Sequence, residues 1–248
     1  MLRTPDFPFP DEKSFFRFPS VRDATPEGIV AVGGDLSPGM LLSAYRQGIF
    51  PWFSEGDPLM WWSPDPRFVM FPENIRVSKS MKRILKRKNY RVTLDSDFVS
   101  VIGHCKIVKR KKQEGTWITG EMKNAYIELH KMGYAHSVET FIDGELSGGL
   151  YGISLGSCFF GESMFSLYPD ASKIALILLV WRLFDAGFTM VDCQVYTPHL
   201  ERMGAENISR ETFLRKLEEG LKRDTLRGCW GKEFADFPES RAYNSLFL

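Results

Sequence analysis

The 248-residue sequence predicts an α+β protein, in which a small N-terminal α/β domain (residues 1–63) precedes a larger domain (residues 64–248). Three apolar runs with strand character follow one another in the larger domain, at residues 135–142, 146–154 and 157–165. The turns between these runs are at Asp143-Gly144 and at Gly156, and Asp-Gly between apolar runs is a strong hairpin signal. The larger domain is therefore expected to contain a mixed, mostly antiparallel sheet.

A buried helix and a returning strand are predicted after these runs. Residues 172–186 are apolar nearly all round, which is typical of a helix covered on all sides. Residues 189–195 then read as a strand. A strand–helix–strand unit pairs its outer strands in parallel, directly or with one strand between them.

The N-terminal domain is expected to begin with residues 1–27, rich in Pro and Phe, wrapped over the surface. A short apolar strand follows at residues 29–32. Ser37 as N-cap and Pro38 at the first helical position predict a helix that ends at Gly48. Its apolar face is formed by Met40, Leu41, Ala44 and Tyr45.

Half of the six tryptophans, Trp52, Trp61 and Trp62, fall in residues 49–67, which read as a loop. One interpretation is a hydrophobic plug between two lobes. The other is a pocket wall that stacks on a base or an aromatic side chain.

Positive charge is concentrated in residues 76–112, where thirteen Lys and Arg stand against two Asp, although the chain has a net charge of only +1. A basic helix is predicted there, with cations at Lys79, Lys82, Arg83, Lys86 and Arg87. Such a run is often a solvated helix face. A second basic run, residues 106–112, and a strand-like segment at 90–94 between the two favour nucleic-acid contact through phosphates.

The remaining pattern predicts a helix at residues 121–132 ended by Gly133, short helices at 198–203 and 210–221, and an irregular tail packed on the surface from Gly228. Four cysteines without a CxxC pair argue against a disulfide framework or a zinc site. The histidines show no metal-ligand spacing. Without a signal peptide or a spanning segment, a cytoplasmic protein is expected.

Three polar residues interrupt the apolar runs at 157–165 and 189–195: Glu162, Asp192 and Gln194. Asp192 and Gln194 share one face of their strand, because strand side chains alternate. Parallel pairing would let the three meet beside one cleft. The alternative is that Asp192 caps a neighbouring loop. Ser163 lies in Gly-Glu-Ser-Met-Phe, which lacks the closing glycine of a nucleophile elbow.

The order of helix, antiparallel meander, helix and returning strand is that of the acyltransferase fold typified by the GNAT superfamily, a fold analogy that does not give function. Members that use acetyl-CoA bind its pyrophosphate at the N-terminus of the central helix. Here that loop, residues 167–172, has no glycine, and Asp170 would repel phosphate. We therefore expect an acyl donor other than CoA, with a CoA-dependent N-acyltransferase and a non-catalytic tRNA-binding module as the alternatives.

Several segments resemble the bacterial leucyl/phenylalanyl-tRNA–protein transferases: GGDLSPGMLLSAYRQGIFPWF, WWSPDPR, EGTWIT, HSVE, GGLYG, FFGESMFS, ASKIAL and DCQ. The resemblance covers roughly residues 28–215. It implies a GNAT-like C-terminal domain, no cofactor, and transfer of Leu, Phe and sometimes Met from aminoacyl-tRNA to proteins that begin with Arg or Lys. The modified protein would then be degraded through the N-end rule pathway. A monomer without a membrane partner is expected.

The resemblance also implies site residues. The catalytic positions fall on Asp192 and Gln194, with Glu162 beside them. Substrate-binding positions fall on Trp52, Trp117, Tyr126, Leu150, Phe159, Ser163, Met164, Leu179 and Val191. We expect Gln194 to orient the amine, Asp192 to hold or polarise Gln194, and Glu162 to attract the cationic acceptor. Leu150 and Leu179 stand where some relatives have Met and Phe, so the preference among Leu, Phe and Met is left open.

Overall fold

Two β-sheets form the framework of the chain, and the computed structural model describes residues 13–107 and 118–247. The smaller, three-stranded sheet has the order β1-β3-β2, formed by β1 (Ile29–Val32), β3 (Met60–Trp62) and β2 (Phe50–Pro51). The larger, seven-stranded sheet has the order β10-β4-β9-β8-β7-β6-β5. Its strands are β4 (Arg67–Met70), β5 (Arg91–Leu94), β6 (Ala135–Ile142), β7 (Glu145–Leu155), β8 (Cys158–Ser166), β9 (Met190–Gln194) and β10 (Glu206–Ile208).

Strands β8 and β9 are parallel, whereas the other neighbours in the seven-stranded sheet are antiparallel. This confirms the mixed, mostly antiparallel sheet. The strand–helix–strand unit pairs its strands directly, with Cys158 opposite Met190 and Phe160 opposite Asp192.

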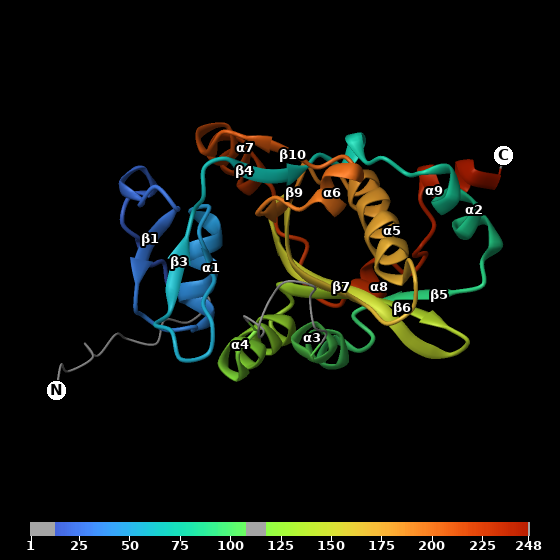
Figure 1. Cartoon of the computed structure of the whole chain (residues 1–248), viewed down its shortest axis with the longest axis horizontal. Coiled ribbons are helices and arrows are strands. Elements are labelled where there is room, and N and C mark those ends of the chain that lie inside the picture. Colours follow the sequence, from blue (N-terminus) through green and yellow to red (C-terminus); the bar gives the residue numbers. More distant parts are fainter. Residues whose placement is uncertain (1–12, 108–117, 248) are drawn as a thin grey trace.

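Helices cover both faces of the larger sheet, with α3 and α4 on one face and α5 on the other (Figure 1). The α-helices are α1 (Pro38–Arg46), α2 (Lys79–Arg87), α3 (Phe98–Ile107), α4 (Gly120–Lys131), α5 (Ala171–Asp185), α6 (Pro198–Arg202), α7 (Arg210–Leu221), α8 (Trp230–Glu233) and α9 (Arg241–Asn244). Short 3₁₀ turns occur at Val21–Asp23, Pro72–Asn74 and Ser245–Phe247. One apolar core lies under α1, α3 and α4 and a second lies under α2 and α5.

Most predicted elements are confirmed, and several match at both ends. Strands β1 and β6 and helix α7 span the predicted residues. Helix α1 begins as expected, because the Ser37 hydroxyl accepts a hydrogen bond from the Met40 amide over 3.3 Å. The described residues before β1 are mostly exposed, but Phe18 is buried and its ring lies edge-on to Trp61.

Two predictions were wrong, and one helix was missed. Residues 49–67 are not a loop, because they form β2 and β3 and lead into β4. Helix α3 was not predicted. The tail after Gly228 is not confined to the surface, because the Trp230 side chain is fully buried in the core under α5. None of the helices in the described residues has the length and apolar character needed to cross a membrane.

Candidate functional site

Strands β8 and β9 separate near the centre of the larger sheet. Their pairing ends where Phe160 faces Asp192. Beyond this point β8 stays paired with β7, while Gln194 of β9 pairs with Phe68 of β4. Across the gap the Gln194 Nε2 donates a hydrogen bond of 2.8 Å to Oε1 of Glu162. The side chains of Glu162 and Gln194 therefore join the two strands where backbone hydrogen bonds no longer do.

A β-bulge in β8 sets the direction of Glu162. The register between β7 and β8 shifts where Gly152 faces Gly161, and Glu162 is left without a partner opposite it. Phe160 and Glu162 consequently both point toward α1 and α4, whereas Met164 packs on the α5 side. A Cβ on Gly152 would lie 2.2 Å from the Phe160 carbonyl oxygen, so the bulge requires glycine at this close approach.

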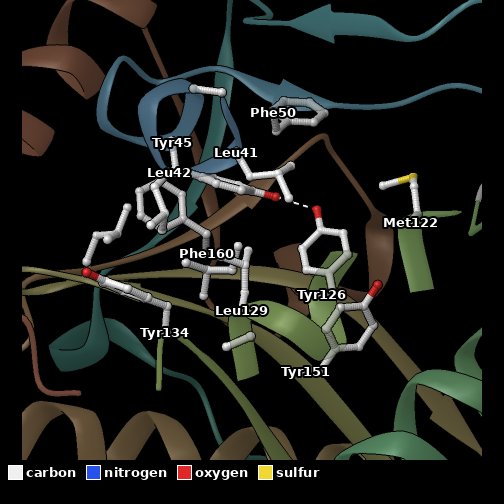
Figure 2. Packing of buried hydrophobic residues seen from close by; sticks show 14 of the residues in the cluster. Leu41, Leu42, Tyr45, Phe50, Met122, Tyr126, Leu129, Tyr134, Tyr151 and Phe160 are labelled. Carbon is white, nitrogen blue, oxygen red and sulfur yellow. Dashed lines mark hydrogen bonds between the residues drawn. The ribbon is translucent and has the colours of Figure 1, made fainter. Parts of the chain in front are cut away.

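Glu162 is buried between two tyrosines. The Tyr45 hydroxyl from α1 lies 2.7 Å from Glu162 Oε1, and the Tyr126 hydroxyl from α4 lies 2.9 Å from Oε2. The two hydroxyls contact each other at 2.5 Å and point toward one another in Figure 2. Burial raises the pKa of Glu162 from its usual 4.5 to about 7, although the hydrogen bonds from Tyr45, Tyr126 and Gln194 act in the opposite direction.

Asp192 is held by a buried ion pair. Arg67 donates from Nε to Oδ1 over 2.9 Å and from Nη2 to Oδ2 over 2.7 Å, and both side chains are fully buried. The guanidinium lies between the rings of Phe50 and Phe213 and also donates to the Gly48 carbonyl. This bidentate geometry is the strongest form of a carboxylate contact, and it fixes Asp192 inside the protein.

Gln194 adopts an unusual backbone conformation that Asp192 supports. Its φ is +64°, a left-handed value that costs a residue other than glycine about 1–3 kcal/mol. The Gln194 amide donates to Asp192 Oδ1 over 2.9 Å, so the fixed carboxylate holds this conformation. The structure thus brings Glu162, Asp192 and Gln194 together as the sequence predicted, and their catalytic roles remain predictions.

The predicted substrate-binding residues divide between the two faces of the sheet. Those buried in the core on the α5 face are Leu150, Phe159, Leu179 and Val191. Met164 packs against the same core and Ser163 is buried in β8, whereas Tyr126 lies on the opposite face. Trp52 is half-buried with its ring 5.6 Å from that of Trp62, and Trp117 lies outside the described residues. Their roles in binding stay predictions.

The predicted basic helix is confirmed as α2, capped by the Ser78 hydroxyl and anchored by the buried side chains of Met81 and Leu85. Its predicted tRNA-binding residues are all exposed: Lys79, Lys82, Arg83, Lys86 and Arg87. Within residues 13–107 and 118–247 none of the five forms an ion pair. Of the second basic run, residues 108–112 lie outside the described part of the chain.

Two residues of the site were missed from the sequence. Tyr45 was assigned only to the apolar face of α1, and Arg67 was read as the end of a loop. A usable signal existed for Arg67, since a buried carboxylate such as Asp192 needs a cationic partner. In the described residues no group of three His, Cys, Asp or Glu side chains is placed to hold a metal ion.

Comparison with solved structures gives matches of low sequence identity and low TM-score. A functionally unknown conserved protein from Staphylococcus epidermidis superposes with a TM-score of 0.41 and 10% identity, covering 73% of this chain and 68% of the other. The structure of L-PGS from Bacillus licheniformis gives a TM-score of 0.37 and 14% identity, covering 73% and 60%.

Sequence comparison gives much closer relatives. A family model described as leucyl/phenylalanyl-tRNA protein transferase matches residues 69–218, and the model of its N-terminal domain matches residues 34–65. The leucyl/phenylalanyl-tRNA–protein transferase of Syntrophus aciditrophicus (strain SB) is 58% identical over 86% of this chain and 89% of its own length. That of Myxococcus xanthus (strain DK1622) is 52% identical over 89% and 94%. The chain therefore belongs to the leucyl/phenylalanyl-tRNA protein transferase family.

Proposed function

We propose that this chain transfers leucine or phenylalanine, and methionine as a third amino acid, from aminoacyl-tRNA to the α-amino group of proteins that begin with Arg or Lys. The observation that carries this proposal is the joined polar cluster of Glu162 and Gln194 where β8 and β9 separate. In the reaction the amine nitrogen bonds to the ester carbonyl carbon. The ester C–O bond breaks, and the ribose oxygen takes up a proton.

Alignment of the two substrates is the main task of the site, because aminolysis of an activated ester is downhill. Proximity and orientation supply roughly 7–11 kcal/mol of such a barrier. Gln194 orients the α-amine through a hydrogen bond, and the amine is easily neutral at a reference pKa of about 8. Asp192 is fully buried and acts as a positioning residue through the Gln194 backbone.

Glu162 attracts the cationic side chain of the Arg or Lys at the start of the acceptor protein. Transfer of the amino acid then marks the acceptor protein for N-end rule degradation. The apolar residues near the β8–β9 separation select the aminoacyl side chain: Leu150, Phe159, Met164, Leu179 and Val191. Such a pocket discriminates modestly, since one methylene group counts for about 1–3 kcal/mol. We further propose that the enzyme acts as a cytoplasmic monomer.

Residues 64–248 form a GNAT-like domain and residues 1–63 a separate one in this proposal. The change from the smaller to the larger sheet between β3 and β4 supports the boundary. CoA is disfavoured as a donor, because the loop before α5 has no glycine and Asp170 stands at the N-terminus of this helix.

Helix α2 binds the acceptor stem of the tRNA through phosphates. The double substitution Lys82→Glu with Arg83→Glu is expected to weaken tRNA binding by at least tenfold at low salt. Each lost phosphate contact should reduce the slope of log K against log[salt] by about 0.7–0.9. Filter binding across a salt series measures both quantities.

A matched control reverses two exposed cations outside α2, Lys222→Glu with Lys232→Glu. These changes alter the net charge equally and should leave the salt slope unchanged. Equal weakening by both pairs would show that α2 has no special role.

The function itself is tested by mixing the protein with radiolabelled Phe-tRNA and a peptide that begins with Arg. Labelled peptide is the expected product, and a peptide that begins with Glu should stay unlabelled. Absence of label from both peptides would refute the enzymatic function.

A further inference from the structure

The oxygens of Tyr45, Tyr126 and Glu162 form a closed triangle of short contacts. The separations are 2.5 Å between the two hydroxyls, 2.7 Å from Tyr45 to Oε1 and 2.9 Å from Tyr126 to Oε2. All three distances lie in the range of O–H···O hydrogen bonds. Each such bond requires its own proton, so the triangle requires three.

The two tyrosines supply only two of these protons. If Glu162 were ionised and both hydroxyls donated to it, the phenol oxygens would face each other at 2.5 Å with lone pairs alone. If Tyr45 instead donated to Tyr126, its own oxygen would lie 2.7 Å from a carboxylate oxygen with no proton between them. Either arrangement places two acceptors in repulsive contact.

A neutral Glu162 removes this conflict. Its carboxyl proton is donated from Oε2 to Tyr126, Tyr126 donates to Tyr45, and Tyr45 donates back to Oε1. Every oxygen of the ring is then satisfied, and Oε1 still accepts the hydrogen bond from Gln194. Burial raises the pKa of both phenols well above the usual value, so neither tyrosine gives up its proton at neutral pH.

We propose that the substrate-free enzyme keeps Glu162 as a neutral acid inside this ring, and that the cationic acceptor binds with release of the proton. This inference rests on the proposed function for the identity of the acceptor. The proton passes from the carboxyl to buffer, and the carboxylate that remains pairs with the positive charge of the incoming Arg or Lys. Tyr45 and Tyr126 are therefore positioning residues for the acceptor site.

The charged surroundings of Glu162 agree with this assignment. The titratable groups facing it are Tyr45, Tyr126 and Asp192, with Tyr151 behind the tyrosines and Arg67 paired to Asp192. Burial raises the pKa of Glu162 to about 7, and the nearby charge of Asp192 acts in the same direction. The folded chain holds this proton more tightly than the unfolded chain. The contribution of Glu162 to the free energy of unfolding therefore decreases as the pH rises from 4.5 toward 7.

The ionisation of Glu162 in the full substrate-free chain tests the first part of the proposal. The ¹³C signal of its side-chain carboxyl, assigned by its loss in Glu162→Gln, is expected to titrate with a midpoint of about 7. Should the substitution prevent folding, the wild-type signal can be assigned from its through-space contacts with the tyrosine rings. A midpoint near 4.5 overturns the neutral acid. This measurement does not depend on transfer activity.

Addition of an Arg-initiated peptide, without aminoacyl-tRNA, tests the coupling. At pH 6 the peptide should move the Glu162 signal to the carboxylate position. As the pH rises toward the midpoint, the dissociation constant of the peptide should fall by up to about tenfold per pH unit. Above the midpoint it should level off. Glu162→Gln should remove this part of the pH dependence, whereas ionisation of the peptide amine would persist. A bound peptide that leaves the signal at the acid position overturns the coupling.

Discussion

Asp192→Ala is expected to lower the free energy of unfolding by about 3–5 kcal/mol, because it leaves a buried guanidinium without its countercharge. Arg67 and Asp192 are both fully buried and joined by two hydrogen bonds. The loss is a large fraction of a total stability of about 5–15 kcal/mol. Denaturant unfolding at neutral pH measures it, and turnover should be assayed where the variant remains folded.

The substitution should also reduce turnover, because the backbone N–H of Gln194 loses its hydrogen-bond acceptor, Asp192 Oδ1. The double variant Arg67→Met with Asp192→Leu separates the two effects. Replacing a buried ion pair by apolar side chains is often neutral or stabilising, so stability should largely return. Turnover should not return, because the Gln194 backbone is still unsupported. A stability loss below about 1 kcal/mol for Asp192→Ala would contradict a structural role for the ion pair.

The polar cluster could be predicted in part because its geometry follows from local rules. Strand–helix–strand units pair in parallel, and that rule placed Glu162 near Asp192 and Gln194. The partner of Asp192 could not be found in this way, since Arg67 lies 125 residues earlier on a strand that was not predicted. Tyr45 was likewise seen as part of an apolar helix face, because its hydroxyl partner comes from another element.

The bulge in β8 is a second feature that the pattern does not reveal. Strict alternation puts Phe160, Glu162 and Met164 on one face, yet Met164 packs on the other. Gly161 and the facing Gly152 were the local hints, since glycine inside a strand often marks a bulge. The predicted substrate-binding residues therefore fall on both faces of the sheet, whereas the sequence analysis assigned them to one pocket.

Missed elements share a physical cause, which is that tertiary packing outweighed local preference. Helix α3 contains β-branched residues, which lower helix propensity, although Asp97 accepts a hydrogen bond from the Ser100 amide in the manner of an N-cap. In residues 49–67 the prolines and glycines read as loop. The two strands there are very short and gain their stability from burying Phe50 and Trp61.

Trp230→Ala is expected to cost about 3–5 kcal/mol of folding free energy, because it removes a fully buried tryptophan side chain and leaves a cavity. The indole ring stacks on His136 with centroids 3.8 Å apart, and its Nε1 donates to the Leu226 carbonyl. The Trp230 amide and His136 Nδ1 both bind Asp95 Oδ2. Thermal and denaturant unfolding of the full chain measure the loss.

Phe247→Ala is the matched control from the same tail, since that ring is 45% exposed and contacts mainly Lys88 and Tyr243. Its loss should be about 0.5–1 kcal/mol, the value of an exposed cation–π contact. A similarly small effect for Trp230→Ala would mean that the tail lies on the surface as the sequence indicated. A large effect of Trp230→Ala instead shows that the tail is anchored in the core under α5, where Phe234 and Tyr243 are also buried. A chain ending before Trp230 should therefore be far less stable than one ending after Ser245.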